Sequence, residues 1–430
     1  MRIIQSMNKN AFWILFLLLS LGFGKTSMAQ NAAGDTLRVT LKQTEDLFLK
    51  NNLALISQKY NIDIASAQVI TARLFTNPDF SLANGIHATG VPNPLSEQSV
   101  SVSQLFFTAG KRNKNIQLAK ISVDQAKYQF FDLLRTLKFT LHSDFYAVYY
   151  QSQSAKVYNE EISSLAKTLA VFKDQFQKGN IAEKEVLRIQ SQLYSLQAEY
   201  NSLLSGIDTV QSELKILIKA SPRTYIDPLE NFDVTNKQLV SSIPYQQLLD
   251  SAYSNRYDLK YAKTSVDYNE LNMRLQKATA IPDVSLSINY DKLGSYGNNF
   301  ISAGIAFSLP FFNRNQGAIQ QARIAIDQSK VQLQSQQNQV ESDVATNYKT
   351  ALRLENLYNS FDPKFKDDFT HLIQEVNLNY QKRNLGMLEF LDFYDSYKTN
   401  TLQLNNLQFN RVISLEQLNY VTGTTFFNKP

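Results

Sequence analysis

Cysteine is absent from this chain of 430 residues, and long apolar runs are almost absent. Without cysteine the protein forms no disulfide bond, and it lacks the lipidated cysteine that some exported proteins carry at the mature N-terminus. After the first residues no stretch approaches about 18 unbroken apolar residues, so the sequence predicts no transmembrane helix. The 22 tyrosines and 27 phenylalanines leave two classes open: a soluble exported protein, and a strand-built outer-membrane protein with a weak apolar signal per strand.

Side chains that commonly carry catalysis or bind metal ions are scarce or scattered. The three histidines, His87, His142 and His371, lie far apart, and cysteine is absent and methionine rare, so no metal-ligand cluster is visible. No Gly-x-Ser-x-Gly segment and no triad pattern with a histidine occurs. The sequence therefore predicts no enzyme, no metal site and no cofactor.

The formal net charge of +5 overstates how basic the mature chain is. Residues 1–29 have a basic start with Arg2 and Lys9, an apolar stretch Ala11–Leu21 and a small-residue end Ser27-Met28-Ala29, a pattern typical of a secretory signal peptide. Cleavage after Ala29 leaves 40 basic and 38 acidic residues, a net charge of +2. This small excess gives little support for nucleic-acid binding.

The chain repeats itself at a spacing of 204 residues. Matching positions include Leu55 with Leu259, Pro78-Asp79 with Pro282-Asp283, Leu105 with Leu309, Phe107 with Phe311, and Glu185 with Glu389. We therefore divide the mature chain into a first copy (30–220), a linker with small elements of its own (221–244), and a second copy with a C-terminal segment (245–430). Each copy predicts the order helix, strand, strand, helix, helix.

Each copy contains two segments with a period of two, which predicts strands with one apolar and one polar or small face. In the second copy the apolar faces are Val284, Leu286, Ile288 and Tyr290, then Ile301, Ala303, Ile305, Phe307 and Leu309. The first copy is less regular, with Asn84 and Gln104 as exceptions. Turns are expected at Gly90–Pro94 and Gly294–Asn299.

Long proline-free stretches predict long helices. Lys111–Lys178 and Gln316–Phe361 contain no proline, and a helix of some 65 residues would be on the order of 100 Å long, a length typical of coiled coils. A capping box at Thr40 and Gln43 predicts the start of the first helix, which should run to about Thr76 before Asn77-Pro78. Asp362-Pro363 should kink or break the second-copy helix. Gly179-Asn180 and Arg383-Asn384 mark two hairpin tips.

Four amphipathic strands cannot form a complete membrane structure alone. An open sheet leaves two edges unpaired, and each unpaired backbone group in hydrocarbon costs several kcal/mol. Single-chain barrels begin at about eight strands, so the sheet must close with strands from other copies of the chain.

The sequence resembles the TolC family of outer-membrane factors over nearly all of the mature chain. The segments that carry the resemblance are Thr40–Gln43, Val102–Leu105 running into Ala109–Arg112, and Leu309–Gly317. Within them, Gly110-Lys111-Arg112 and Asn313–Gly317 are most similar to the branch serving heavy-metal and cation efflux pumps. The resemblance implies a mixed α and β membrane protein that forms a homotrimer, with a twelve-stranded outer-membrane β-barrel and a tube of twelve coiled-coil helices across the periplasm. It also implies a periplasmic adaptor and an inner-membrane pump, of the resistance-nodulation-division type, as partners, and contact with outer-membrane lipid.

The resemblance also implies roles for residues at the hairpin tips. Glu389 and Asp392 fall on the carboxylate positions with which the family narrows its channel, and three chains would give two acidic rings; the alternative is a solvated helix face. The tip-closing contacts would involve Glu185, Arg188 and Arg383, although Leu385 stands where the family has a closing arginine. The adaptor would dock on two loops, Gly179, Asn180, Ile181, Ala182 and Asn384, Leu385, Gly386, Met387, which simple hairpin chemistry also explains.

Three functions stay open. The first is a passive exit duct for efflux of cations, heavy metals or drugs. The second is the outer-membrane duct of a type I protein secretion system, and the third is a periplasmic coiled-coil scaffold, which would leave the four strands unexplained. Lys111-Arg112 and Arg314, just after strand ends, either meet lipid headgroups or cap the junction between strand and helix.

Overall fold

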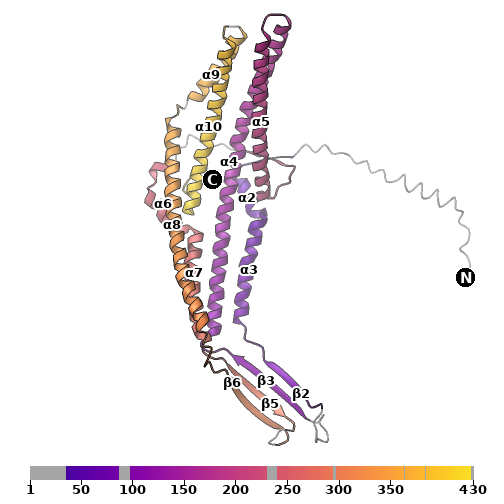
Figure 1. Cartoon of the computed structure of the whole chain (residues 1–430), viewed down its shortest axis with the longest axis vertical. Coiled ribbons are helices and arrows are strands. Elements are labelled where there is room, and N and C mark those ends of the chain that lie inside the picture. The colour runs from indigo at the N-terminus through magenta and orange to yellow at the C-terminus, as the bar shows by residue number, and fades with distance from the viewer. Residues whose placement is uncertain are drawn as a thin grey trace, which may run out of the picture.

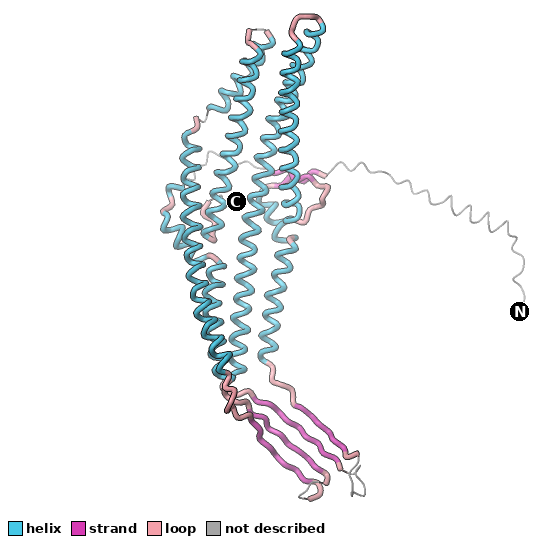
Figure 2. Tube along the Cα trace, viewed as in Figure 1, coloured by secondary structure: helices cyan, strands magenta, loops and turns pink. Residues whose placement is uncertain are grey.

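The computed structural model describes residues 35–86, 97–229, 240–293, 297–362, 364–382 and 384–427. The protein is a long helical body with a four-stranded sheet at one end and two helical hairpins at the other (Figures 1 and 2). The predicted signal peptide, the loop Gly90–Pro94, His87 and Arg383 lie outside the described residues. None of the helices in the described ranges combines the length and hydropathy that a membrane-spanning helix needs.

Nine α-helices within the described residues build the body. They are α2 (Leu41–Asn51), α3 (Leu53–Arg73), α4 (Lys111–Gln177), α5 (Glu183–Ile218), α6 (Tyr245–Asn255), α7 (Tyr257–Thr279), α8 (Gln316–Ser360), α9 (Phe365–Gln381) and α10 (Met387–Thr422). The 67-residue α4 runs along most of the helical body (Figure 1), as the proline-free stretch predicts. Helix α8 ends at Ser360 and α9 begins at Phe365, so the helix is interrupted in the region where the sequence predicts a kink or a break at Asp362-Pro363.

The first helix begins where predicted but is interrupted. Thr40 caps α2 through a full capping box with Gln43, which confirms the predicted start. The expected single helix is two helices, because Asn52 ends α2 and caps α3 by accepting a hydrogen bond from the Leu55 amide at 3.0 Å. The Asn52 side chain also donates to the Leu217 carbonyl at 2.9 Å. This bend therefore depends on a contact with α5.

Helix α3 ends at Arg73, three residues before the predicted end at Thr76. Thr76 is instead hydrogen-bonded to strand residues. Its hydroxyl donates to the Leu105 carbonyl at 3.0 Å, and the Gln104 side chain donates to the Thr76 carbonyl at 2.9 Å. Residues 74–78 are consequently a non-helical connection into the first strand.

The sheet contains β2 (Asp79–Asn84), β3 (Gln98–Phe106), β5 (Val284–Asp291) and β6 (Phe300–Phe307). The strands pair antiparallel in the order β2-β3-β5-β6, so the two copies meet where β3 pairs with β5. Within the described residues β2 and β6 each pair with only one strand. Both edges of the sheet are thus left open in the single chain.

The two faces of the sheet alternate as the sequence predicts. One row across all four strands is polar, with Ser81 opposite Ser101, Ser101 opposite Asn289 and Asn289 opposite Ser302. Residues on the other face are large, apolar and exposed: Phe80, Leu82, Val102, Leu286, Ile288, Ile301, Ile305 and Phe307. Gln104 lies opposite Leu286 on this apolar face, as the predicted exception.

The junction between sheet and helices is built around Lys111. Gly110 adopts the left-handed conformation (φ 67°) and lets α4 start directly after β3. The Lys111 ammonium donates to the Asp283 carboxylate at 2.7 Å and to the Ile281 carbonyl at 2.6 Å, and the Thr108 amide donates to Asp283 at 2.8 Å. Lys111 therefore caps the junction, the second of its two predicted roles.

The arginines of the junction behave differently from one another. Arg112 donates to the Arg73 carbonyl at 3.0 Å and lies over the Phe75 ring at 4.2 Å, so it also binds within the chain. Arg314 has an exposed side chain.

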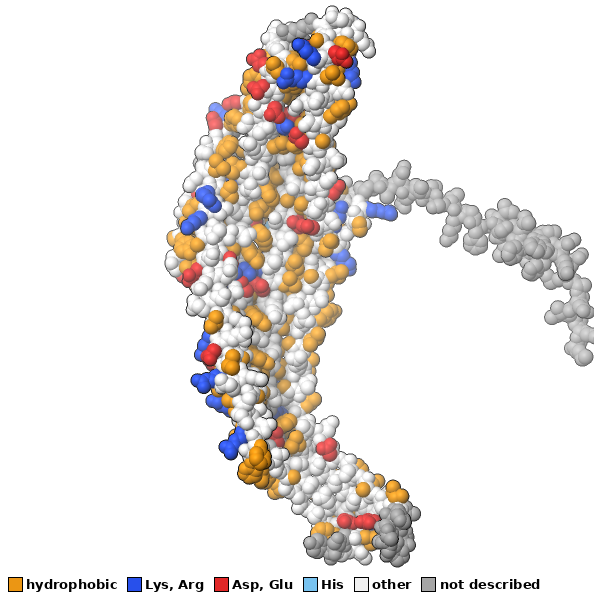
Figure 3. Space-filling model, in the orientation of Figure 1, with side chains coloured by type: hydrophobic (Ala, Val, Ile, Leu, Met, Phe, Trp, Pro, Cys, Tyr) orange, Lys and Arg blue, Asp and Glu red, His pale blue; other side chains and the backbone are white. Residues whose placement is uncertain are grey.

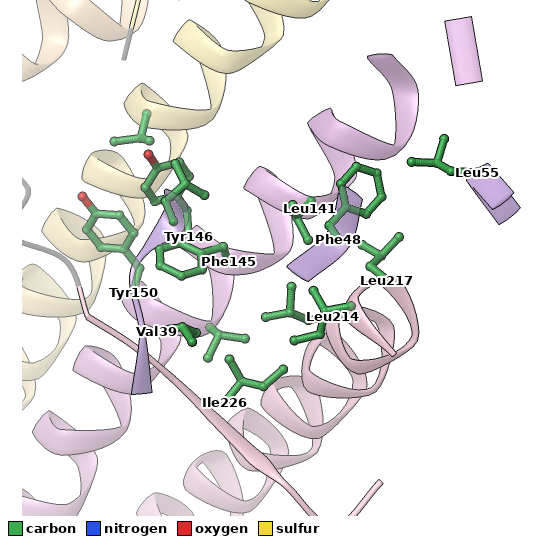
Figure 4. Packing of buried hydrophobic residues seen from close by; sticks show 14 residues of the cluster. Val39, Phe48, Leu55, Leu141, Phe145, Tyr146, Tyr150, Leu214, Leu217 and Ile226 are labelled. Carbon is green, nitrogen blue, oxygen red and sulfur yellow. The ribbon is translucent and has the colours of Figure 1, made fainter. Parts of the chain in front are cut away.

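The middle of the body has a dense core, which contains a second small sheet that the sequence does not predict. Strand β1 (Thr36–Val39) pairs in parallel with β4 (Tyr225–Pro228) in the predicted linker, and a short 3-10 helix, η2 (Val240–Ser242), follows. Figure 4 shows residues from β1, β4 and helices α2 to α5 converging in this cluster. Phe48, Leu141, Phe145, Tyr146, Leu214 and Ile226 are almost fully buried there.

A charged bridge crosses the body beside this core. The imidazole of His142 on α4 lies 2.5 Å from the Glu45 carboxylate on α2 and 2.9 Å from the Glu416 carboxylate on α10. Burial opposes charge on His142, but the hydrogen bonds to Glu416 and Glu45 outweigh it and raise the pKa of His142. Burial also opposes charge on Glu45, yet His142 and Lys138 lower the pKa of Glu45 to about 2. The bridge thus ties helices of both copies by ionic contacts.

Candidate functional site: the tips of the helical hairpins

Two hairpin tips lie at the end of the body opposite the sheet (Figure 1). In the first, between α4 and α5, Gly179 takes a left-handed conformation (φ 75°) and its amide donates to the Phe176 carbonyl at 2.9 Å. The Asn180 amide donates to the Gln175 carbonyl at 2.9 Å. These two bonds satisfy carbonyl groups that the end of α4 would otherwise leave free. The first predicted hairpin tip is confirmed.

The second tip connects α9 to α10. The Lys382 amide donates to the Leu378 carbonyl at 3.1 Å and the Asn384 amide donates to the Asn379 carbonyl at 2.9 Å. Gly386 is the N-terminal cap of α10 and has an extended backbone. The two tips therefore have related turn chemistry, in agreement with the repeat.

An apolar cluster fixes the position of α10 beneath these turns. Phe390 is fully buried and stacks on Tyr380 with ring centroids 4.0 Å apart. Ile181, Leu385 and Met387, three of the predicted docking residues, pack against this cluster. Leu385, which replaces the family's closing arginine, therefore makes apolar contacts. The other five docking candidates are exposed: Gly179, Asn180, Ala182, Asn384 and Gly386.

Glu389 and Asp392, the predicted channel-narrowing residues, are both exposed near the start of α10. They are three apart and therefore share one side of the helix. Phe390 and Tyr394, the buried residues of the same turns, face the apolar cluster. The packing of α10 therefore turns the two carboxylates away from the protein interior and leaves them accessible to solvent or to another chain.

The predicted closing residues Glu185 and Arg188 both lie on α5, and Glu185 is half-buried while Arg188 is exposed. Among the described residues no salt bridge includes either side chain. Burial, together with the nearby Glu185 carboxylate, raises the pKa of Tyr380. Glu185 and Tyr380 also line a cavity of about 1040 Å³ between the two hairpins. With Arg383 outside the described residues, the closing contacts stay a prediction.

A second charged site, which the sequence did not reveal, lies further along the same helices. Lys398 on α10 is buried and forms ion pairs with Glu199 on α5 at 3.2 Å and Asp395 on α10 at 3.1 Å. Glu161 on α4 is 5% exposed and lies in the field of these three groups. Burial is the main cause that raises the pKa of Glu161, to about 8. The Lys398 ammonium lowers this pKa in part, and the Asp395 and Glu199 carboxylates raise it further.

This site was missed because its members come from three helices with no shared sequence motif. In the repeat register Glu161 corresponds to Phe365 and Lys398 to Tyr194, so the second copy gives no signal. Elsewhere too, the described parts of the chain hold no group of three or more His, Asp or Glu side chains arranged to bind a metal ion.

The fold described above is that of the TolC-like outer-membrane channels. The outer membrane channel CmeC of Campylobacter jejuni superposes with a TM-score of 0.71 at 16% identity, over 90% of this chain and 87% of that chain. A family model described as "Outer membrane efflux protein" matches residues 45–218 and 248–358. The chain belongs to the outer membrane efflux protein family, whose members are passive channels.

Two relatives have names that describe metal resistance. The cobalt-zinc-cadmium resistance protein CzcC of Cupriavidus metallidurans is 19% identical over 67% of this chain and 68% of its own length. The nickel-cobalt-cadmium resistance protein NccC of Alcaligenes xylosoxydans is 21% identical over 66% of this chain and 65% of its own length. The resemblance to the heavy-metal branch that the sequence indicates is thus also found in alignments over about two thirds of the chain.

Proposed function

We propose that the protein is the outer-membrane exit duct of a tripartite efflux system, open to the exterior through a barrel and connected to a pump through its helical tips. The observation that carries this proposal is the four-stranded sheet. It has one apolar and one polar face and, among the described residues, two unpaired edges, at β2 and β6. Such a sheet is stable in a bilayer only when other chains complete it.

Three chains arranged as a ring complete the structure. The β6 edge of one chain pairs with the β2 edge of the next, which gives a twelve-stranded barrel with the polar faces inside. The helices support the same arrangement, because both flanking helices carry exposed apolar residues along their length: Ile56, Tyr60, Ile64 and Ile70 on α3, and Ile324 and Val331 on α8. A heterologous contact between α8 and the next α3 covers both stripes, and such contacts close into rings.

The hairpin tips are the end that receives substrate. The exposed turn residues Gly179, Asn180, Ala182, Asn384 and Gly386 give a periplasmic adaptor backbone and small polar groups to dock on, with Ile181, Leu385 and Met387 holding the turns from below. The adaptor in turn connects the duct to an inner-membrane pump of the resistance-nodulation-division type. Glu185, Arg188 and Arg383 are the candidates for contacts that close the tip at rest.

Glu389 and Asp392 form two acidic rings around the channel axis. Their exposure on the side of α10 opposite Phe390 supports this role, because three copies of α10 then bring six carboxylates together. Rings of carboxylates attract cations and repel anions. Together with the names of the two metal-resistance relatives, the rings favour divalent metal cations as the exported substrate.

Two other functions are less well supported. A duct for type I protein secretion has the same architecture, and the substrate of the partner pump distinguishes it from an efflux duct. A periplasmic coiled-coil scaffold explains α4 and α5 but gives no role to a sheet whose apolar face is exposed on all four strands.

The acidic rings are tested in planar bilayers with the purified trimer. We expect a low-conductance, cation-selective pore that trivalent cations block from the periplasmic side, since attraction scales with charge. Glu389→Gln combined with Asp392→Asn should keep the fold, weaken cation selectivity and remove most of the block.

The matched control is Asp174→Asn combined with Glu183→Gln, which removes the same charge from the exposed surface of the first hairpin. This control should leave selectivity and block unchanged. If the Glu389 and Asp392 variant conducts and is blocked like the wild type, the two residues lie on the outer surface and form no ring.

A further inference from the structure

The end of the helical body next to the sheet has an unusual charge distribution. The segments 64–78, 108–123, 271–282 and 308–326, which contain the four helix ends at the sheet, include no Asp or Glu. The same segments carry six exposed basic side chains: Arg73, Lys120, Arg274, Lys277, Arg314 and Arg323. The whole chain has 43 basic and 38 acidic residues, so this bias is local to the junction.

None of these six basic residues forms a salt bridge within the described residues. This holds even though Asp124, Glu270 and Asp327 lie four residues along the same helices from Lys120, Arg274 and Arg323. Asp283 precedes β5 and is paired with Lys111 at 2.7 Å, so it balances a different, buried cation. Asp79, the first residue of β2, forms no salt bridge among the described residues. We call the six exposed basic residues the basic collar.

Exposed apolar side chains lie directly beside the collar. In the connection between β6 and α8, Leu309, Phe311 and Phe312 are 61%, 67% and 96% exposed. Figure 3 shows hydrophobic side chains gathered at the bend between helices and sheet, and Lys and Arg side chains along the α7–α8 edge on the same face. The connection continues the β6 strand, whose residues Ile305 and Phe307 belong to the apolar face.

We propose that this junction binds the periplasmic phospholipid leaflet of the outer membrane, with Phe311 and Phe312 among the acyl chains and the basic collar on anionic headgroups. The inference rests on the proposed function, which puts the apolar face of the sheet in a bilayer. Aromatic residues favour the boundary between hydrocarbon and headgroups. Exposed lysines and arginines just beyond that boundary attract anionic lipid. The collar thus selects phosphatidylglycerol-like lipids over zwitterionic ones.

Phe312 is 96% exposed, so the described part of its own chain leaves the ring uncovered. Contact of so large an apolar surface with lipid is more favourable than contact with water. The neighbouring chain of the proposed ring is the competing cover. The α3 end that it would bring to this α8 end contains Arg73 and no Asp or Glu between residues 64 and 78, so a second basic surface would face the first. Like charges facing each other oppose association, whereas an anionic leaflet neutralises them.

The test uses tryptophan fluorescence, since Trp13 is the single tryptophan and lies in the predicted signal peptide. The trimer of a Phe312→Trp variant is reconstituted in vesicles of equimolar phosphatidylglycerol and phosphatidylcholine, with bromine on the acyl chains of one lipid at a time. An Ile305→Trp variant serves as the reference for a residue inside the bilayer. The tryptophan of Phe312→Trp should be quenched more strongly by brominated phosphatidylglycerol than by brominated phosphatidylcholine. Each basic residue close to the headgroups should enrich phosphatidylglycerol beside the tryptophan roughly fivefold at low salt.

Charge neutralisation separates the collar from the aromatic contact. In the Phe312→Trp background, Arg314→Gln combined with Arg323→Gln should make the two brominated lipids quench about equally. The total quenching should persist, because the aromatic contact with the acyl chains remains. The control Lys349→Gln with Arg353→Gln removes two exposed charges from α8 far from the sheet and should leave the preference intact.

Each other result has a definite meaning. Quenching of Phe312→Trp without lipid preference, or quenching of Ile305→Trp alone, overturns the inference; the latter result means that another chain covers Phe312. If neither tryptophan is quenched, the sheet is outside the bilayer and the proposed function itself fails.

Discussion

Replacing Glu161 with glutamine should stabilise the protein more as the pH rises. Burial and two neighbouring carboxylates raise the pKa of Glu161 from 4.5 to about 8, so the folded protein holds a proton at neutral pH that the unfolded chain has released. Between pH 4.5 and about pH 8 the wild type therefore loses stability as the pH rises, because the unfolded chain binds fewer protons than the folded protein. Above about pH 8 this loss is complete. Glutamine resembles the protonated acid and has no such dependence.

The size of the effect follows from the shift of the pKa. A shift from 4.5 to about 8 corresponds to a ceiling of about 5 kcal/mol. The side chains of Glu199 and Asp395 are 42% and 60% exposed, so solvent screens much of their repulsion. We therefore expect the difference in the free energy of unfolding between Glu161→Gln and the wild type to grow by ~2–3 kcal/mol, in favour of the variant, from pH 5 to pH 8.5.

Thermal unfolding followed by circular dichroism at pH 5, 6.5 and 8.5 measures this difference in purified protein. The raised pKa of His142 gives both proteins a common loss of stability at high pH, so the difference between them isolates Glu161. Glu160→Gln, an exposed neighbour on α4, is the control and should follow the wild type. The opposite result is that the wild type becomes more stable relative to Glu161→Gln as the pH rises. It would mean that Glu161 is ionised and paired with Lys398, and it would refute the prediction.

Four further substitutions test three other parts of the structure. Ile305→Arg on the apolar face of the sheet should cost about 2–4 kcal/mol and lower the yield of assembled protein, whereas Ser302→Arg on the polar face should cost much less; equal yields would reverse the assignment of the faces. Lys111→Met should cost ~1–3 kcal/mol, because Asp283 loses its charged partner, and an unchanged denaturation midpoint would contradict this. His142→Leu leaves two buried carboxylates facing each other and should lower stability at pH 7 by about 3–5 kcal/mol, which the same unfolding assay detects.

The strands and the long helix could be predicted because their signals are local. The alternation of Val284, Leu286 and Ile288 with serines is the pattern that an amphipathic strand requires, and the structure has β5 there. The absence of proline after Lys111 permits a helix of 67 residues. Gly179 predicts the first hairpin tip because the turn needs a left-handed residue.

The features that escaped prediction depend on contacts between distant segments. The break at Asn52 requires the Leu217 carbonyl of α5, and the pairing of β1 with β4 joins residues about 190 positions apart. Glu161 becomes a perturbed acid only when α4, α5 and α10 come together. At the tips, sequence identified the candidate carboxylates, while their exposure follows from the packing of Phe390 beside them.

The native mass of the purified protein in detergent tests the central claim most directly, because the open edges at β2 and β6 require other chains to complete the sheet. We expect a single species with three times the mass of the mature chain, which dissociates or aggregates when detergent is removed. A monodisperse monomer that stays in solution without detergent would contradict it.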